Sequence, residues 1–399
     1  MSERVALAYS GGLDTTVAVA WLKENKGLDV IAVAVDVGQG GDFEELQDRA
    51  LKAGAVEAVV VAAAEQFADH YAAAALHANA LYQQKYPLVS ALSRPLISVH
   101  LAGAAKKHRA RFVAHGCTGK GNDQVRFETC LAALYPEANI LAPVREWGLT
   151  REQAVDYAVE RGLPLPAGGS SLYSIDENLW GRAIECGDLE DPMTEPPPDV
   201  WELTSDPQAG DPEYLEVEFR RGLPVSLNGE AMPFAALVQR VGRVAGARGF
   251  GRIDMIEDRV VGIKSREVYE APGALALIAA HRDLEELTLD RELLRTKRQL
   301  EQKWADLVYE GHWFSPLKES IDAFIAATSP HVSGTVRLKA EAGSVRVVGR
   351  SSGESLYDEG LASYSASDTF DHRAAGGFLK LWSLPARVWS GRHPPDPKV

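Results

Sequence analysis

A segment near the N-terminus combines hydroxyl side chains, glycines and one carboxylate. It follows the apolar run Val5 to Tyr9, opens a stretch with helical apolar periodicity, and consists of Ser10, Gly11, Gly12, Leu13, Asp14, Thr15 and Thr16. The start of a helix leaves backbone N–H groups unpaired and carries positive dipole charge, and glycines let the backbone approach an anion closely. We therefore predict a polyphosphate-binding turn between a strand and a helix, to which the hydroxyls also donate.

Two common nucleotide signatures are absent from the sequence. No segment matches the P-loop pattern G-x-x-x-x-G-K-[ST], and Gly38 and Gly40 are followed by Phe43 where the dinucleotide fingerprint requires a third glycine. What remains is S-G-G-x-D-[ST], which resembles the motif of the N-type ATP pyrophosphatases. That resemblance implies cleavage of ATP between its α- and β-phosphates.

The carboxylate of Asp14 has two possible roles in this segment. It can cap the helix that follows, a contact that contributes about 1 kcal/mol. It can instead orient a complex of Mg²⁺ with the phosphates. The sequence does not identify the other ligands of such a metal ion.

A second group of polar residues follows the predicted strand 111–115. Thr118 and Asn122 can donate to a carboxylate, and Asp123 can accept from an ammonium group and take its proton. Arg126 has the fork geometry that suits a carboxylate, but it can also form a structural salt bridge on the following helix. Lys120 can neutralise phosphate charge or be a solvated loop lysine.

The first 165 or so residues alternate strand and helix patterns. Strands are expected at 5–9, 28–37, 56–61, 111–115 and 140–142, and a helix at 43–53. Thr150 and Gln153 form a capping box for a further helix that ends at Gly162. The fold class is therefore α/β with a doubly wound parallel sheet. Ligands of such sheets bind at the carboxyl ends of the strands, where Ser10, Asp36 and Gly116 lie.

The pattern changes after the proline- and glycine-containing stretch 163–169, which is typical of a linker. Asn228 and Gly229 predict a hairpin turn, and residues 252–263 predict two strands around Glu257 and Asp258. Helices are expected at about 273–287, 291–310 and 315–327, with a hairpin at 336–348. This is an α+β domain.

The tail from Gly376 places several large apolar residues in a short stretch, where Pro385 limits any helix. The tail is either a strap on its own domain or an arm on another subunit, and we favour the arm. The expected domains are residues 1–166 for nucleotide binding, 167–372 for synthesis and multimerisation, and 373–399 for the oligomerisation tail.

The overall composition restricts partners and compartment. The net charge of −14 disfavours nucleic acid as a partner, because phosphate backbones bind clustered lysines and arginines. No apolar stretch is long enough for a membrane span, and no leader segment is recognisable. Cys117, Cys130 and Cys186 form no C-x-x-C pair. These features favour a cytoplasmic protein with small-molecule ligands.

Several segments together resemble the argininosuccinate synthase family. They are 10–16, 36–40, 173–179, 262–270 and above all 114–128, which contains the highly specific run HGCTGKGNDQVRFE. The resemblance extends in order to about residue 380. It implies a cytoplasmic homotetramer of arginine biosynthesis and the urea cycle. Such an enzyme joins citrulline and aspartate to give argininosuccinate, using ATP with Mg²⁺ and releasing AMP and diphosphate through a citrullyl-adenylate.

The resemblance also implies the roles of individual residues. Asp14 and Asp123 are the catalytic candidates. The ATP site comprises Ala8, Tyr9, Ser10, Gly11, Gly12, Leu13, Asp14, Thr15, Thr16, Val35 and Gly116. The aspartate site comprises Thr118, Asn122 and Asp123. The citrulline site comprises Tyr86, Asn122, Arg126, Ser174, Glu257 and Tyr269. Because these residues come from both expected domains, the site is expected in the cleft between them.

The sequence departs from the family pattern in the citrulline pocket. Ala91 and Ala183 replace residues that carry hydroxyls in the family, and the neighbouring Ser90 is a candidate to compensate for the first. Two rival functions fit the sequence less well. A tRNA-thiolating or ammonia-channelling ATP pyrophosphatase would need reactive cysteines, a basic face or a glutaminase domain. A non-catalytic nucleotide-binding protein would not require both the 114–128 segment and Glu257.

Overall fold

A computed structural model describes residues 2–165, 173–207 and 210–396. Its contacts divide the chain into two compact units, residues 1–354 and residues 355–399. The predicted linker at 163–169 and the predicted boundary between 166 and 167 fall largely outside the described residues. The three-domain division therefore stays a prediction.

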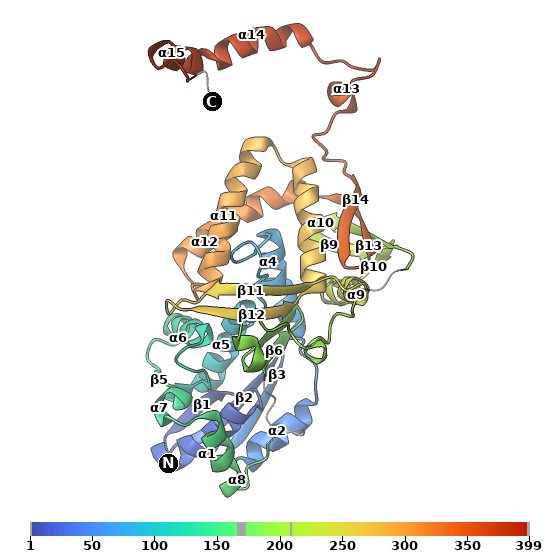
Figure 1. Cartoon of the computed structure of the whole chain (residues 1–399). Helices are drawn as coiled ribbons and strands as arrows, with labels where there is room; N and C mark the ends of the chain where they lie inside the picture. The colour runs from blue at the N-terminus through green and yellow to red at the C-terminus, as the bar shows by residue number, and fades with distance from the viewer. Residues whose placement is uncertain (1, 166–172, 208–209, 397–399) are drawn as a thin grey trace. The chain divides into compact units, whose positions relative to one another are not determined.

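A five-stranded parallel sheet forms the first half of the main unit (Figure 1). Its strands are β1 (Arg4–Ala8), β2 (Asp29–Asp36), β3 (Glu57–Ala62), β4 (Phe112–Ala114) and β5 (Asn139–Leu141). The strand order is β3-β2-β1-β4-β5, so the chain adds β2 and β3 on one side of β1, and β4 and β5 on the other. The loops after β1 and β4 therefore diverge and leave a crevice, which is the usual ligand position in such sheets. The predicted α/β fold class is confirmed.

Helices cover both faces of this sheet because β1 is apolar on both sides. Val5 and Leu7 pack in a core with α1 (Leu13–Lys26), whereas Ala6 and Ala8 pack in the larger core that includes α5 (Val89–Lys107). The remaining helices of this half are α2 (Phe43–Lys52), α3 (Ala64–Phe67), a π-helical turn (Ala68–Ala72), α4 (Ala73–His77), α6 (Asn122–Leu134), α7 (Pro143–Trp147) and α8 (Arg151–Glu160). The predicted capping box of α8 is present.

Two antiparallel sheets form the second half of the main unit. The first has the order β11-β12-β7-β6 and contains β6 (Ser174–Asn178), β7 (Gly181–Glu185), β11 (Arg252–Asp258) and β12 (Lys264–Glu270). The second has the order β10-β9-β8-β13-β14 and contains β8 (Glu213–Arg220), β9 (Leu223–Leu227), β10 (Glu230–Ala231), β13 (Gly334–Glu341) and β14 (Ser344–Ser351). The helices are α9 (Phe234–Ala247), α10 (Pro272–Thr288), α11 (Arg291–Tyr309) and α12 (Pro316–Thr328), with short 3₁₀ turns at 187–190, 198–200 and 329–331.

Most turns of this half lie where the sequence predicts them, with one exception. Asn228 and Gly229 both have positive φ, as a type I′ hairpin turn requires. The turn predicted around Glu257 and Asp258 is wrong, because both residues belong to β11 and the turn lies at 259–263. Glu257 is therefore held rigidly within a strand.

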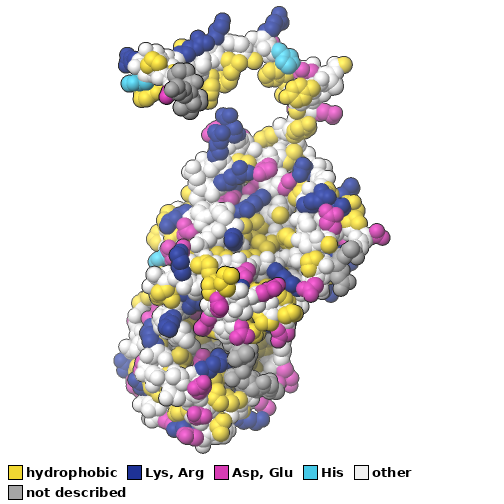
Figure 2. All heavy atoms as spheres, in the orientation of Figure 1, with side chains coloured by type: hydrophobic (Ala, Val, Ile, Leu, Met, Phe, Trp, Pro, Cys, Tyr) yellow, Lys and Arg dark blue, Asp and Glu magenta, His cyan; other side chains and the backbone are white. Residues whose placement is uncertain are grey.

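The second unit contains α13 (Glu359–Ala362), α14 (His372–Trp382) and α15 (Leu384–Arg392). Pro385 coincides with a helix boundary, as expected: α14 ends at Trp382, and Pro385 occupies the first turn of the separate helix α15, where its missing N–H has no helical partner to lose. Large apolar side chains are exposed along these helices (Figure 2), including Leu381 and Trp382 at 70% and Trp389 at 66%.

Three broader properties follow from the described residues. Figure 2 shows basic and acidic side chains interspersed over the visible face of the main unit. All three cysteines are free thiols. Among the helices that the structure describes, none combines the length and apolar character needed to cross a bilayer.

Candidate active site

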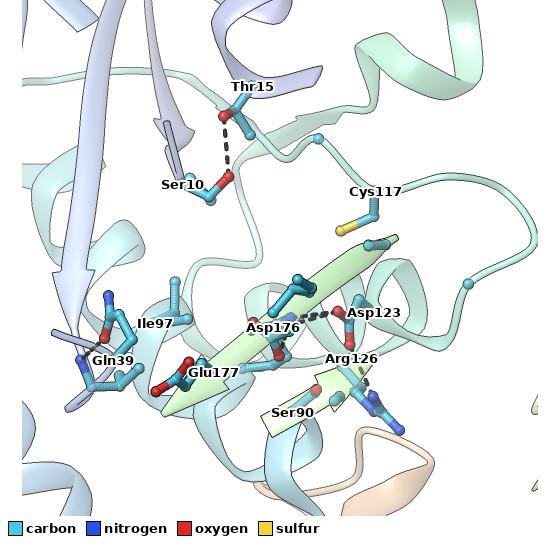
Figure 3. A pocket seen from close by; sticks show the side chains of 18 of the residues that line it. Ser10, Thr15, Gln39, Ser90, Ile97, Cys117, Asp123, Arg126, Asp176 and Glu177 are labelled. Atoms are coloured by element: carbon cyan, nitrogen blue, oxygen red, sulfur yellow. Dashed lines mark hydrogen bonds and ion pairs between the residues drawn. The ribbon is translucent and has the colours of Figure 1, made fainter. Parts of the chain in front are cut away.

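A cavity of about 560 Å³ lies at the crevice between the loops after β1 and β4 (Figure 3). It brings together most of the predicted site residues, namely Ala8, Tyr9, Ser10, Asp14, Thr15, Val35, Tyr86, Gly116, Thr118, Asn122, Asp123, Arg126, Ser174, Glu257 and Tyr269. These residues come from the parallel sheet and from the β6/β7/β11/β12 sheet. Both halves of the main unit therefore contribute to one pocket.

The turn after β1 presents two hydroxyls to this cavity. Ser10 Oγ and Thr15 Oγ1 lie 3.2 Å apart, and the backbone N–H of Gly12 points at Ser10 Oγ at 3.4 Å. Gly11 adopts a positive φ of 76°, which glycine alone adopts readily. The hydroxyls and the start of α1 together form a surface suited to phosphate oxygens.

Asp14 is not the cap of α1. The N-cap position belongs to Gly12, which makes no side-chain capping bond, and Asp14 lies within the first turn and lines the cavity. Burial raises the pKa of its carboxyl group, and the charge of Arg151 opposes that effect. Of the two roles left open by the sequence, this placement favours contact with a ligand or its metal ion.

Four predicted ATP-site residues lie outside the cavity lining, namely Gly11, Gly12, Leu13 and Thr16. Thr16 is fully buried and its hydroxyl lies 3.2 Å from the Tyr9 hydroxyl, so its side chain supports the turn from behind. A Cβ on Gly11 would lie 2.5 Å from Leu46 Cδ1, so this glycine also serves packing against α2. The Thr16 hydroxyl thus faces Tyr9 rather than the cavity, and its donation to phosphate stays a prediction.

Gly116 gives the loop after β4 its close approach to the phosphate turn. A Cβ at this position would lie 2.8 Å from Thr15 Cγ2, well inside van der Waals contact. On the other side, Gln39 folds back on the end of β2: its Oε1 accepts from the Val37 N–H at 2.7 Å and its Nε2 donates to the Val35 carbonyl at 3.0 Å. Both features shape the cavity beside Val35, where an adenine ring is expected.

The loop after β4 carries Thr118 and leads into α6, whose first turn carries Asn122 and Asp123. Asn122 Oδ1 accepts from the Val260 N–H at 2.9 Å, and its Nδ2 donates to the Tyr309 hydroxyl at 2.7 Å. An amide nitrogen has two donors, so one N–H of Asn122 remains for a substrate. Thr118 is exposed at the cavity wall, whereas Lys120 is exposed outside the lining.

Asp123 is held between two arginines (Figure 3). Its Oδ2 accepts from Arg94 at 2.9 and 2.6 Å, and its Oδ1 accepts from Arg126 Nη1 at 2.9 Å. Although burial acts in the opposite direction, the two guanidinium groups hold the pKa of Asp123 well below its usual range. Asp123 is thus well suited to attract an ammonium group and poorly suited to take its proton.

Arg126 does make the salt bridge that the sequence left open as an alternative, one helical turn from Asp123. Its Nε also donates to the Tyr309 carbonyl at 2.9 Å. Among the described residues these bonds use Nε and Nη1, so Nη2 is the nitrogen that can receive a citrulline carboxylate. The structural and binding roles of Arg126 are therefore compatible.

The β6/β7/β11/β12 sheet turns one face toward the cavity. Because side chains alternate along a strand and paired residues share a face, the register places polar residues of all four strands together. The residues on this face that line the cavity are Ser174, Asp176, Ala183, Glu185, Glu257, Glu267 and Tyr269. Period-two alternation explains why residues far apart in the sequence meet here.

Glu257 is buried and accepts hydrogen bonds from two tyrosines. The hydroxyl of Tyr269 donates to one carboxylate oxygen, and that of Tyr309 donates to the other at 2.6 Å. Burial raises the pKa of Glu257, and the tyrosine bonds oppose the rise. Tyr86 stacks on Tyr269 with ring centroids 4.2 Å apart. The cluster forms a rigid wall whose carboxylate suits an ammonium group.

The two missing hydroxyls have different consequences. Ala91 is fully buried and lies outside the lining, whereas Ser90 lines the cavity (Figure 3). A hydroxyl is thus available one position earlier. Ala183 does line the cavity, so that departure from the family pattern changes its surface.

Sequence reasoning gave no role to several residues that the structure places in or behind the site. They are Gln39, Arg94, Asp176, Glu177, Glu185, Arg259, Glu267 and Tyr309. Arg259 and Glu267 lie in or next to the 262–270 segment, so their charge and strand position were visible. Tyr309 lies at the end of α11 and carries no local signal of its role.

Comparison with protein families matches almost the whole chain. Residues 4–164 match the model described as the N-terminal HUP domain of arginosuccinate synthase, and residues 173–389 match the model of its C-terminal domain. The two matches meet near the change of pattern at residues 163–169.

Curated relatives give the same result over the full length. The chain is 53% identical over 398 residues to argininosuccinate synthase of Oceanobacillus iheyensis, covering 99% of this chain and 95% of that protein. It is also 53% identical over 388 residues to the Streptococcus suis protein of that name, covering 97% of each. Among solved structures, a predicted tRNA methyltransferase subunit from Methanocaldococcus jannaschii overlaps 40% of this chain and 75% of its own, with 13% identity and a TM-score of 0.29. The chain belongs to the argininosuccinate synthase family.

Proposed function

We propose that this cavity joins citrulline to aspartate with ATP, releasing AMP and diphosphate, as its family membership indicates. The observation that supports this proposal is that three groups of residues line one cavity. They are the phosphate turn at Ser10 and Thr15, the loop with Thr118 and Asp123, and the wall with Glu257. A condensation of three substrates needs them held together in one orientation.

The chemistry explains why ATP is required. The ureido carbon of citrulline is a poor electrophile because two nitrogens donate electrons to it. Attack of the ureido oxygen on the α-phosphorus releases diphosphate and converts that oxygen into a leaving group. The aspartate ammonium group loses a proton to solvent, and the free amine attacks the ureido carbon. The carbon–oxygen bond then breaks to release AMP, whose phosphate takes up the proton that the attacking nitrogen loses. Positioning and charge stabilisation supply most of the acceleration for such transfers.

The substrate positions follow from charge and shape. We place the β- and γ-phosphates at Ser10 and Thr15 and the adenine beside Ala8, Val35 and Gly116. Aspartate takes Thr118, Asn122 and Asp123, the last of these facing its ammonium group. Citrulline takes Arg126 through its carboxylate and Glu257 through its ammonium group, with Tyr86, Ser174 and Tyr269 around it.

Mg²⁺ enters with the nucleotide in this account. The cavity lining carries more carboxylates than arginines, the acidic residues being Asp14, Asp42, Asp123, Asp176, Glu177, Glu185, Glu257 and Glu267, against Arg94, Arg126 and Arg259. A polyphosphate in such a lining needs a counter-cation. No group of three or more histidine, cysteine or acidic residues suited to a metal ion occurs among the described residues. Phosphate oxygens with Asp14 as one carboxylate fit the preference of Mg²⁺.

The assembly and location are also proposals. We propose a homotetramer in which the apolar helices α14 and α15 pack on another subunit, because exposed apolar surface of this kind usually marks an interface. A cytoplasmic location fits the three free thiols, which a reducing compartment maintains.

A product assay tests the proposed function. The purified protein is incubated with ATP, Mg²⁺, citrulline and aspartate, and AMP, diphosphate and argininosuccinate are quantified by mass spectrometry. We expect equal amounts of the three products and none when citrulline is omitted. Diphosphate release that depends on an alternative acceptor, such as tRNA, would instead support another ATP pyrophosphatase activity.

A further inference from the structure

The turn between β11 and β12, residues 259–263, rests on the loop and helix start that carry the proposed aspartate ligands. Arg259 Nη1 donates to the backbone carbonyl of Lys120 at 3.3 Å, and the Val260 N–H donates to Asn122 Oδ1 at 2.9 Å. Lys120 and Asn122 flank Gly121 and follow Thr118 by two and four positions. One turn of the antiparallel sheet thus holds the segment that we assign to aspartate.

The same arginine is anchored on its other side by two strands. Its Nε donates to Ser265 Oγ at 2.7 Å, and its Nη2 donates to Glu267 Oε1 at 2.6 Å and to a carboxylate oxygen of Glu185. Glu267 is almost fully buried, whereas Glu185 remains 36% exposed within the cavity lining. A guanidinium group is the one side chain that can reach all four acceptors from a fixed plane.

Charge explains why an arginine is needed at this point. Burial and the neighbouring Glu267 raise the pKa of Glu185 to about 7, and Arg259 opposes the rise. Without the guanidinium group the two carboxylates would face each other inside a cavity that also contains Asp123. The arginine therefore neutralises this face of the sheet while extending to the Lys120 carbonyl.

We infer that Arg259 is a positioning residue for the aspartate step, holding the 118–122 segment at a fixed distance from the sheet face with Glu185 and Glu267. This inference rests on the proposed function of the cavity. Arg259 itself does not need to touch the reacting atoms. It acts through Thr118 and Asn122, so its loss displaces the incoming amine relative to the ureido carbon more than it disturbs the phosphate turn on β1.

A second arginine on the same hairpin provides a matched control. Arg266 pairs with Asp254 at 2.6 Å and donates to the carbonyls of Asp191 and Thr194, outside the cavity lining. It is even less exposed than Arg259, at 6% against 13%. Substitution of either arginine removes a buried guanidinium group from the same hairpin, but only Arg259 contacts the 118–122 segment.

The test compares Arg259→Lys with Arg266→Lys and the unmodified enzyme in two assays. The first is citrulline-dependent isotope exchange between diphosphate and ATP, which reports adenylate formation alone. The second is steady-state argininosuccinate formation with aspartate varied. For R259K we expect the KM for aspartate to rise about tenfold or more, with exchange retained within about threefold, as a displaced positioning group predicts. For R266K we expect no selective effect on the aspartate step: any change in exchange and in argininosuccinate formation should be of the same size.

Several outcomes would overturn the inference. Equal loss of both half-reactions in R259K, or an unchanged KM for aspartate, would make Arg259 a structural ion pair only. If R259K does not fold, Ser265→Ala removes the acceptor of Nε together with the hydrogen bond that Ser265 donates to Glu267. It leaves the guanidinium group in place, so it should shift the KM for aspartate in the same direction by a smaller factor. A KM unchanged in S265A would contradict the proposal. Absence of citrulline-dependent exchange in the unmodified enzyme would instead refute the proposed function.

Discussion

At the scale of residues, the two arginines beside Asp123 decide what that carboxylate contributes. Arg94 and Arg126 hold it ionised, with a pKa well below its usual range. A permanently charged carboxylate orients an ammonium group but accepts its proton only at a high free-energy cost. The role of Asp123 in this account is therefore electrostatic positioning of aspartate.

Substitution of Asp123 by Asn tests that role with little change of shape. We expect argininosuccinate formation to fall by about 100-fold or more, because the isosteric amide lacks the charge that attracts the amine. Citrulline-dependent exchange between diphosphate and ATP should survive, since it reports adenylate formation and does not involve the aspartate amine. Parallel loss of exchange and product formation would show that Asp123 serves the first step instead.

Substitution of Gly116 by Ala tests the shape of the nucleotide surface. The added methyl group would lie 2.8 Å from Thr15 Cγ2, so the loop and the phosphate turn must separate. We expect the KM for ATP to rise about tenfold or more with the midpoint of thermal unfolding little changed. Thr15→Ser removes Cγ2 and keeps the hydroxyl, so the G116A/T15S double variant should recover part of the loss. A double variant as impaired as G116A would place the clash elsewhere.

The sequence predicted the residues that line the cavity better than those that support them. Ser10, Gly116 and Asp123 belong to local segments whose spacing is informative on its own. Arg94 and Tyr309 act on α6 from elements remote in the sequence, and no local pattern encodes such a contact. Thr16 shows the limit of residue type alone, since its hydroxyl suits phosphate chemically but faces the buried side of α1, toward Tyr9.

At the scale of elements, helices α10 and α11 pack around a buried ionic cluster. Lys297 lies 2.8 Å from Glu285 and 2.5 Å from Glu301, and Asn79 donates to both carboxylates at 2.7 Å. Burial raises the pKa of Glu285 to about 7 despite the lysine. The cluster ties the segment after α4 to the helical hairpin of the second half.

This shift makes stability depend on pH with a defined sign. Between about pH 4.5 and 7 the folded chain holds the Glu285 proton that the unfolded chain has lost, so stability falls as pH rises and levels off above 7. In Glu285→Gln this position no longer titrates, so the fall in the free energy of unfolding with pH should be smaller by about 2 kcal/mol. We expect the drop in unfolding midpoint between pH 5.5 and 8 to shrink by about 2 to 4 °C or more in E285Q. The exposed neighbour provides the control, Glu286→Gln, and an identical drop in both variants would contradict the account.

Element boundaries were predictable where the signal is periodic and failed where a turn has no glycine or proline at its start. The 3.6-residue pattern predicted α10 to α12 within a few residues. Asn228 and Gly229 predicted the hairpin turn between β9 and β10. The turn after β11 was placed too early because Glu257 and Asp258 are polar. Glu257 is polar because it faces the cavity from a strand, and polarity alone does not separate a site from a turn.

At the scale of the whole molecule, the exposed apolar side chains of α14 and α15 indicate an interface with another chain. Leu381, Trp382 and Trp389 are 66 to 70% exposed, a degree of apolar exposure that usually marks a surface where another chain packs. The proposed homotetramer supplies such a surface.

Deletion of the chain from Gly376 onward tests this role. We expect sedimentation velocity to show a species smaller than that of the full-length protein, because the interface loses α15 and most of α14. The matched variant Trp382→Ser with Trp389→Ser should weaken assembly in the same direction while keeping the chain length. An unchanged sedimenting mass for both variants would refute the arm hypothesis.

An isotope label on the ureido oxygen of citrulline tests most directly whether that oxygen attacks the α-phosphorus of ATP. Citrulline labelled with oxygen-18 at the ureido oxygen is converted with ATP, Mg²⁺ and aspartate, and the products are analysed by mass spectrometry. We expect AMP to gain about two mass units while diphosphate and argininosuccinate carry no label, because the oxygen leaves bonded to phosphorus. Unlabelled AMP, or label in diphosphate or orthophosphate, would contradict it.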